Sequence, residues 1–188
     1  VVVLGRSAAG IERMRTAVAA LDGSKRELVV AESIAEAVAD ADIVSIATSS
    51  SAPPEIITSQ LKPGALVCLP ADICVDETAW SQTTVVDSIR LYDQWMLEVP
   101  PPRESIRGLF GVQLAERHAA DPSSATPVGL PAVLAGEHAG RVSDDQVIFF
   151  GTGGLPVEDV AWATELFRRA EHADLGISLP IWEQPELR

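Results

Sequence analysis

Cysteine is scarce in this chain of 188 residues. Its two cysteines, Cys68 and Cys74, are too few for a disulfide-stabilised scaffold and lack the spacing of a metal site. The sequence also lacks an uninterrupted apolar run long enough to cross a lipid bilayer. These absences indicate a globular protein with reduced thiols. We therefore expect a cytoplasmic location and no membrane partner.

Positively charged residues are also few. The 14 Lys and Arg residues stand against 27 Asp and Glu residues, which gives a formal net charge of −13. This balance argues against nucleic acid as a partner. The histidines, His118, His138 and His172, are scattered and lack the spacing of metal ligands, so we expect no metal site. A G-x-S-x-G element is absent too, and hydrolase chemistry of that type has no support.

Apolar runs alternate with helical patterns along the chain. Strands are predicted at residues 1–4, 27–30, 42–47, 65–69, 84–87 and 147–150, and helices at residues 9–21, 33–40 and 109–119. A brief helical stretch is predicted around residues 56–61, whereas residues 88–107 show no clear period. Largely apolar strands that alternate with helices predict an α/β fold with a doubly wound, parallel, Rossmann-like sheet covered on both faces.

The last predicted strand is followed by a glycine-rich turn and a helix. Gly151, Gly153 and Gly154 permit a tight turn, and Pro156 suits a first helical turn. Free N–H groups at this helix start could face a phosphate, a carboxylate or a nicotinamide amide. The spacing does not match G-x-G-x-x-G, so a plain connection is the alternative. The helix is predicted to pack one face inward, formed by Val157, Val160, Ala161, Thr164 and Phe167.

Near the start of the chain, Gly5, Arg6 and Ser7 follow the first strand. In a dinucleotide fold, an acidic residue at the end of the second strand favours NAD, and a nearby arginine accommodates the 2′-phosphate of NADP. Here glycine takes the acidic position, Arg6 follows at once, and Ser7 is a further donor. This pattern favours NADP over NAD if the fold binds a dinucleotide. The simpler alternative is an exposed arginine beside a serine that caps a helix.

Asp72 follows the predicted strand at residues 65–69. It thus lies at the edge where open α/β sheets bind their ligands. A carboxylate there, partly shielded by neighbouring apolar residues, could act as a general acid or base. The alternative is a turn or N-cap aspartate. Asp76 and Glu77 are expected to be solvated.

Several short motifs occur in a defined order along the chain. They are Val1-Val2-Val3-Leu4-Gly5-Arg6-Ser7, Ala41-Asp42-Ile43-Val44 through Ala47-Thr48, Leu61-Lys62-Pro63-Gly64-Ala65, Ala71-Asp72, Leu134-Ala135-Gly136, Gly140-Arg141-Val142-Ser143-Asp144-Asp145, and Phe150, Thr152, Gly154, Glu158 and Asp159. In this order they resemble the signatures of the ornithine cyclodeaminase/mu-crystallin family. Any single motif is weak, whereas the ordered set is fairly specific.

The resemblance implies NAD(P)-dependent chemistry at the α-carbon of an amino acid. A hydride would move between that carbon and the nicotinamide, and the imine would be hydrolysed, cyclised or, in the reverse sense, reduced. This implies an amino-acid dehydrogenase, an imine reductase or an ornithine cyclodeaminase-like lyase, with an amino acid or imino acid as substrate. Asp72 matches the catalytic aspartate. The implied NADP or NAD contacts are Arg6, Ser7, Thr48, Ser49, Ser50, Thr152 and Gly154.

The sequence departs from the family pattern at two points. Cys74-Val75-Asp76-Glu77-Thr78 replaces Pro-Gly-Lys-x-Glu after the aspartate, and Gly151 replaces the lysine of Phe-Lys-Ser. The alternative is therefore a non-catalytic, mu-crystallin-like binding protein that retains the cofactor fold. The family's first strand, with its diphosphate loop, and its N-terminal domain have no counterpart here. We expect an incomplete Rossmann-like domain at residues 1–155, apparently lacking its first strand, a C-terminal helix and tail at residues 156–188, and a homodimer formed through the absent domain.

Overall fold

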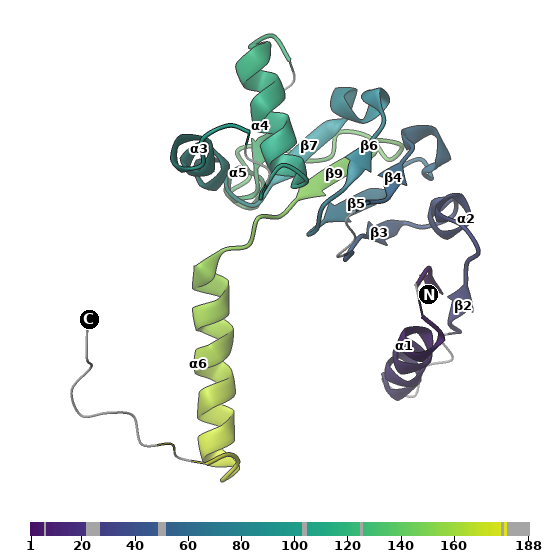
Figure 1. The fold of residues 1–188 in the computed structure, drawn as a ribbon, viewed down its shortest axis with the longest axis vertical. Helices are drawn as coiled ribbons and strands as arrows, with labels where there is room; N and C mark the ends of the chain where they lie inside the picture. Colours follow the sequence, from purple (N-terminus) through teal and green to yellow (C-terminus); the bar gives the residue numbers. More distant parts are fainter. Residues whose placement is uncertain are drawn as a thin grey trace, which may run out of the picture. The chain divides into compact units, whose positions relative to one another are not determined.

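A computed structural model of the protein describes residues 1–5, 7–21, 27–48, 52–102, 105–124, 126–177 and 179. The chain divides into two compact units, Val1–Gly153 and Gly154–Arg188. Figure 1 draws the first unit in purple to green and the second, which contains the long helix α6, in yellow-green. Each unit is described by itself.

The first unit is built around a parallel sheet, to which the described residues contribute five strands in the order β3-β5-β9-β7-β8. These strands are β3 (Ile43–Ser45), β5 (Leu66–Leu69), β9 (Ile148–Gly151), β7 (Thr83–Val86) and β8 (Val128–Gly129). Every neighbouring pair is parallel. The predicted α/β fold class is therefore confirmed, and the apolar runs that predicted β3, β5, β7 and β9 do form its strands.

A second pair of strands lies near the start of the chain. β1 (Val2–Val3) pairs in parallel with β2 (Val29–Val30). Helix α1 (Ala8–Ala20) connects them and begins after Ser7, whose Oγ accepts the N–H of Gly10 at 3.1 Å. Helix α2 (Ile34–Val38) follows β2 and is capped in the same way by Ser33. Both helices begin within two residues of the predicted positions because serine side chains satisfy N–H groups of the first turn.

The segment predicted as helical around residues 56–61 begins as a strand instead. β4 (Glu55–Ile56) pairs in parallel with β6 (Cys74–Val75), and only the short 3-10 helix η1 (Thr58–Gln60) follows β4. A second 3-10 helix, η2 (Glu77–Ser81), follows β6. The two-residue strands depend on pairing between distant segments, so local periodicity could not reveal them.

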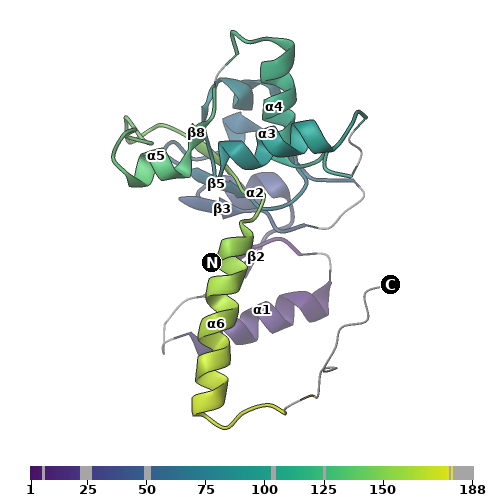
Figure 2. The same ribbon diagram turned by 90° about the vertical axis from the view of Figure 1, so that its left-hand side faces the viewer.

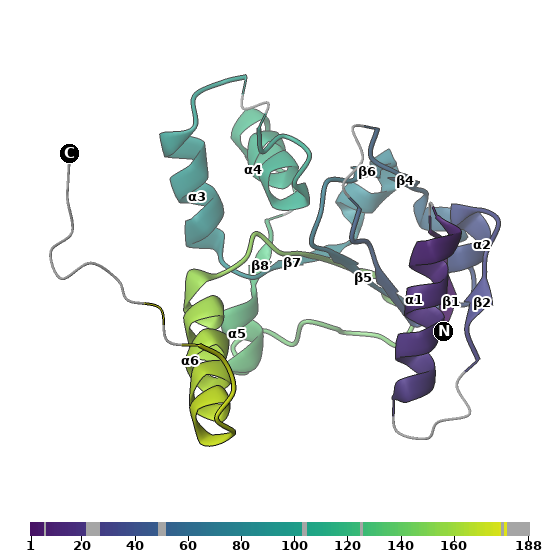
Figure 3. The same cartoon turned by 60° about the horizontal axis from the view of Figure 1, so that its bottom comes forward.

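Three further helices of the first unit are α3 (Ile89–Glu98), α4 (Phe110–Ala120) and α5 (Leu130–Leu134). Helix α4 matches its prediction, whereas α3 was not predicted. The two lie side by side (Figure 2) and share a buried cluster of Val86, Tyr92, Val112 and Leu114. Figure 3 shows both on the same side of the five-stranded sheet. Helix α4 is thereby fixed to the sheet next to the carboxyl end of β7.

The sheet is not covered equally on its two faces. On the face toward α4, Val67 and Phe149 are fully buried, and the ring of Phe110 stacks on Phe149 with centroids 5.7 Å apart. On the opposite face burial decreases toward β3. Cys68 on β5 is half-buried, and Ile43 on β3 is 66% exposed. Cover on both faces, as predicted, is therefore found near β7 and β9 but is incomplete toward β3.

The second unit contains helix α6 (Pro156–His172). The apolar side chains along it are exposed, with 69% of Val157, 65% of Val160 and 64% of Phe167 accessible to solvent. The prediction that this face packs inward is wrong for the described unit. The physical reason is that this unit, as far as it is described, offers α6 no other helix or strand to pack against.

Candidate active site

The carboxyl ends of the parallel strands bring several polar residues to one edge of the sheet. Thr48 follows β3, Asp72 follows β5, Thr152 follows β9 and Asp87 follows β7. Open α/β sheets bind ligands at this edge. The N–H of Thr152 donates to the carbonyl of Leu69 at 3.4 Å, which ties the turn after β9 to the strand that precedes Asp72. The edge thus collects three of the predicted site residues.

Asp72 is exposed at this edge. The neighbouring apolar residues that were expected to shield it, Leu69 and Ile73, are each only 1% exposed because their side chains belong to the core. The turn that carries Asp72 is held from one side, where the N–H of Ile73 donates to the carbonyl of Gly108 at 3.1 Å. Asp72 is thus a solvent-accessible carboxylate on an anchored turn.

Asp76 is not simply solvated, as the sequence had suggested. Its Oδ1 accepts the N–H of Thr58 at 3.0 Å and the hydroxyl of Thr58 at 2.5 Å. Burial tends to raise the pKa of the Asp76 carboxyl, but hydrogen bonds from Thr58, from the Thr78 side chain and from the backbone of Asp76 together hold that pKa below its ordinary value. Asp76 therefore links the end of β6 to the start of η1.

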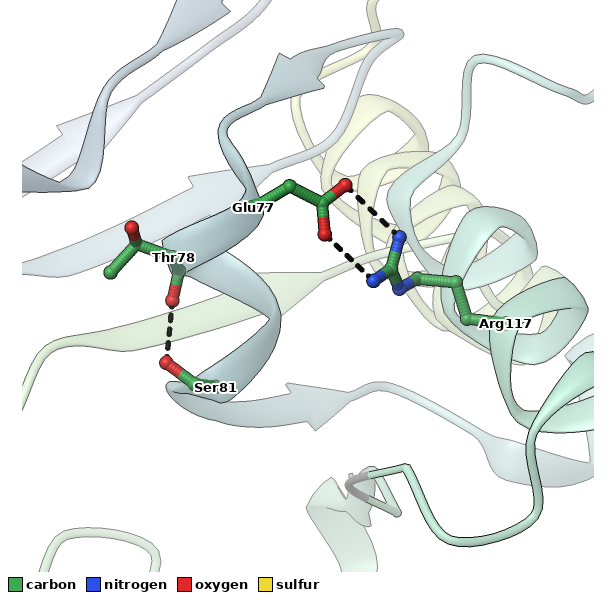
Figure 4. Close-up of polar contacts among 4 residues, drawn as sticks. All are labelled: Glu77, Thr78, Ser81 and Arg117. Atoms are coloured by element: carbon green, nitrogen blue, oxygen red, sulfur yellow. Dashed lines mark hydrogen bonds and ion pairs between the residues drawn. The ribbon is translucent and has the colours of Figure 1, made fainter.

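Glu77 has a structural contact as well. Figure 4 shows its carboxylate facing the guanidinium of Arg117 on α4, with N···O distances of 2.9 and 3.3 Å. In the same view the hydroxyl of Ser81 donates to the carbonyl of Thr78 at 2.8 Å and closes the 3-10 turn. Arg117 also lies over the ring of Trp80 at 4.8 Å. These contacts attach η2 to α4; because the ion pair is exposed, its stabilising effect is small.

Asp87 lies at the same sheet edge and was not among the predicted site residues. Only 6% of it is exposed, and its carboxylate accepts the N–H of Gly153 at 2.7 Å and that of Ser88 at 2.8 Å. One N–H in the turn after β9 is thus already used within the protein and does not await a ligand. The available signal was similar to that for Asp72, an aspartate at the carboxyl end of an apolar strand.

Tyr92 packs against Asp87 and is 4% exposed. Burial raises the pKa of the Tyr92 phenol, and the charge of Asp87 and a hydrogen bond to it raise this pKa further. The contact between Tyr92 and Asp87 thus links helix α3 to the buried carboxylate at the sheet edge.

We expect Tyr92 in the native protein to lose its proton at a higher pH than an unfolded tyrosine, whose pKa is about 10. Because the folded-state pKa is raised, this group's contribution to stability is present below the unfolded value and is lost as the pH rises toward the folded one. The chain has one tyrosine, so tyrosinate absorbance reports Tyr92 alone. Asp87→Asn should lower the midpoint, and the exposed control Asp93→Asn should not. An ordinary midpoint, unmoved by Asp87→Asn, would contradict the assignment.

The predicted cofactor residues are described only in part. Arg6, Ser49 and Ser50 lie outside the described residues. Ser7 caps α1, whose first turn carries no acidic side chain, so the helix dipole there is not neutralised locally. Gly154 has a φ of 85°, in the left-handed region. The position thus requires glycine for its backbone conformation.

A hollow of about 330 Å³ among the described residues is lined by Glu77, Trp80, Ser81, Leu114, Arg117 and Ser124. These lining residues include none of the predicted site residues.

In the described part of the chain, no cluster of His, Cys, Asp or Glu could hold a metal ion. The helices described there include none that is long and apolar enough to cross a membrane.

The sequence model of the ornithine cyclodeaminase/mu-crystallin family matches residues 1–174. The chain belongs to this family. Nearly the whole length takes part in the match, which confirms the resemblance inferred from the short motifs. No curated protein matches the chain.

Solved structures with the same fold include several enzymes. The Δ1-pyrroline-2-carboxylate reductase of Thermococcus litoralis, solved with NADH and L-proline, is 19% identical, with a TM-score of 0.68 over 95% of this chain and 52% of its own. A probable ornithine cyclodeaminase from Bordetella pertussis Tohama I is 22% identical, with a TM-score of 0.63 over 94% and 53%.

The iminosuccinate reductase of Paracoccus denitrificans, solved with NAD⁺, is 18% identical, with a TM-score of 0.64 over 96% of this chain and 51% of its own. The chain thus spans about half the length of these proteins. At such identities the likeness establishes the Rossmann-like fold.

Proposed function

We propose that the protein is an NAD(P)-dependent oxidoreductase that acts at the α-carbon of an amino acid or imino acid. The observation that carries this proposal is the shared sheet edge, where Asp72 follows β5 and Thr152 follows β9, with the Thr152 N–H bonded to Leu69. A dinucleotide bound at this edge would bring its nicotinamide close to a carboxylate. Membership of the family supports the same assignment.

The residues present fit a dinucleotide at both ends. The N–H groups of Ala8 and Ala9 have no acceptor within α1, and the absence of a first-turn acid leaves this helix end suited to a phosphate. Arg6 and Ser7 would hold the 2′-phosphate of NADP. Thr48, Ser49 and Ser50 would lie along the cofactor, and Thr152 and Gly154 near the nicotinamide, which supplies or accepts the hydride when bound. NAD is the alternative, since two structures of similar fold contain NADH and NAD⁺.

In this proposal Asp72 handles the proton. When the α-carbon of an imino acid gains a hydride, its nitrogen gains a proton, and an exposed carboxyl group at the sheet edge can relay that proton from water. In the reverse direction the carboxylate would accept it. The substrates in the names of the similar structures, a cyclic imino acid and iminosuccinate, favour an α-imino acid here.

A non-catalytic binding protein with the same fold is the second candidate. The observation that favours it is the altered turn after Asp72, in which the carboxylates of Asp76 and Glu77 contact Thr58 and Arg117 within the protein. It predicts cofactor binding without hydride transfer. A homodimer and a cytoplasmic location, as expected from the sequence, stay part of the proposal.

Cofactor titration tests the proposal. We expect NADPH to quench the protein's tryptophan fluorescence at lower concentrations than NADH does. Arg6→Ala should weaken NADPH binding about tenfold or more, because a charge-assisted hydrogen bond contributes about 1.5–3 kcal/mol. The matched control Arg168→Ala, at an exposed position of α6, should leave it unchanged. Failure to bind either nucleotide would contradict the proposal.

A further inference from the structure

The turn that carries Asp72 is attached to the segment before α4 and to α4 itself. The N–H of Ile73 donates to the carbonyl of Gly108 at 3.1 Å. The side-chain amide of Gln113 donates to the carbonyls of both Ile73 and Gly108, each at 2.9 Å. Gln113 is 40 positions from Ile73 and 5 from Gly108. Its amide group thus joins two backbone carbonyls that are 35 positions apart in sequence.

Gly108 leaves room for the side chain of Asp72. A Cβ at position 108 would overlap the carboxyl carbon of Asp72 and stand 2.5 Å from its Oδ1 and 2.7 Å from its Cβ. Such distances are far below van der Waals contact, so one of the two segments would have to move. The carboxyl group of Asp72 therefore rests against the bare backbone of Gly108.

Helix α4 gives this attachment a rigid base. Phe110 and Val112, both in the first turn of the helix, are 1% and 0% exposed. The ring of Phe110 stacks between Trp80 and Phe149, with centroid distances of 5.2 and 5.7 Å. Gln113 therefore projects from a helix that is fixed in the core, while Asp72 itself is exposed.

We propose that Gln113 and Gly108 are positioning residues that hold the carboxyl group of Asp72 in its working place. Neither touches the reacting atoms; Gln113 acts through the carbonyl of Ile73, and Gly108 by leaving the space that Asp72 fills. This inference rests on the proposed function of Asp72. A misplacement of about 1 Å at a catalytic group can cost about 100-fold in rate, so this support should matter for turnover.

The test compares two variants with matched controls. Gln113→Glu keeps size but replaces the amide nitrogen that donates to two carbonyls with a carboxylate oxygen that cannot donate, and Gly108→Ala fills the space of Asp72. Gln94→Glu makes the same chemical change on the exposed side of α3. Gly129→Ala adds a methyl group whose nearest atoms are 3.6 Å away, an ordinary contact.

We expect kcat to fall about 10- to 100-fold in Gln113→Glu and in Gly108→Ala, with NADPH affinity unchanged, and to stay near the wild-type value in both controls. Hydrogen exchange at the Ile73 amide should accelerate in Gln113→Glu, because the carbonyl clamp around it is lost. Gln113→Glu adds no volume, so it remains decisive if Gly108→Ala does not fold. Wild-type kcat in Gln113→Glu, despite faster exchange at Ile73, would overturn the proposal.

The proposed function and the positioning role of Gln113 and Gly108 are contradicted by different results. A wild-type protein that binds NADPH but transfers no hydride to any imino acid would overturn the proposed function. The positioning role would then be decided by the carbon NMR resonance of the Asp72 carboxyl group. A resonance that moves in Gln113→Glu but not in Gln94→Glu would support it, and one that moves in neither would overturn it.

Discussion

Asp72→Asn is expected to lower kcat at least about 100-fold, since acid–base catalysis by a positioned side chain contributes about 10²- to 10⁴-fold. Asparagine has almost the same shape and fits the space beside Gly108, but it cannot release or take up a proton at neutral pH. The affinity for NADPH should therefore be unchanged. Initial rates of NADPH oxidation with a cyclic α-imino acid, together with a cofactor titration, separate the two effects.

The control for this variant is Asp159→Asn, the same change at an exposed position of α6. It should turn over at the wild-type rate. Full activity in Asp72→Asn would contradict the role of Asp72 as acid or base. The predicted site residues would then include no other group to supply or accept the proton.

Phe149→Ala is expected to reduce the free energy of unfolding by about 3–5 kcal/mol, the usual cost of removing a large buried aromatic side chain. Phe149 is fully buried on β9, in register with Val67, and its ring stacks with that of Phe110. Phe110 is the first residue of α4, so the cavity left by alanine would also loosen the packing of the helix that carries Gln113. Urea unfolding, with the slope compared between variants, measures the change.

Phe167→Ala is the matched control, because Phe167 is 64% exposed on α6. A surface substitution of this kind should change stability by no more than about 0.5 kcal/mol. Equal losses in the two variants would contradict the assignment of the core to the sheet and α4.

Much of the fold could be predicted from the sequence. Short apolar runs such as Leu66–Leu69 and Ile148–Gly151 form strands of the sheet, and Ser7 and Ser33 cap the helices that follow them. Residues that follow such strands are placed at the sheet edge by topology alone. The location of Asp72 could therefore be predicted.

Other features depend on contacts between distant segments. β4 and β6 are two residues long and exist through their mutual pairing. The attachment of Ile73 to Gln113 joins residues 40 positions apart, and no local pattern marks a glutamine as its donor. Helix α3 could have been predicted, because Leu91, Tyr92 and Trp95 recur at helical spacing after a capping serine.

The exposure of Asp72 shows a different limit. Leu69 and Ile73 are apolar neighbours in sequence, and sequence proximity suggested that they shield the carboxylate. Their side chains instead enter the core on the α4 side of the sheet, while the turn between them directs Asp72 outward. Alternation of side-chain direction along a strand and its turn decides this, and it becomes visible only once the register is known.

Hydride transfer to the α-carbon of an imino acid is the most direct test of the account. The protein would be incubated with a cyclic α-imino acid and NADPH in which both C4 hydrogens of the nicotinamide are deuterium, and the product examined by mass spectrometry. We predict an amino acid with one deuterium, located at the α-carbon. A product without deuterium would contradict hydride transfer from NADPH. No product, although NADPH binds, would contradict the assignment and favour the non-catalytic binding protein.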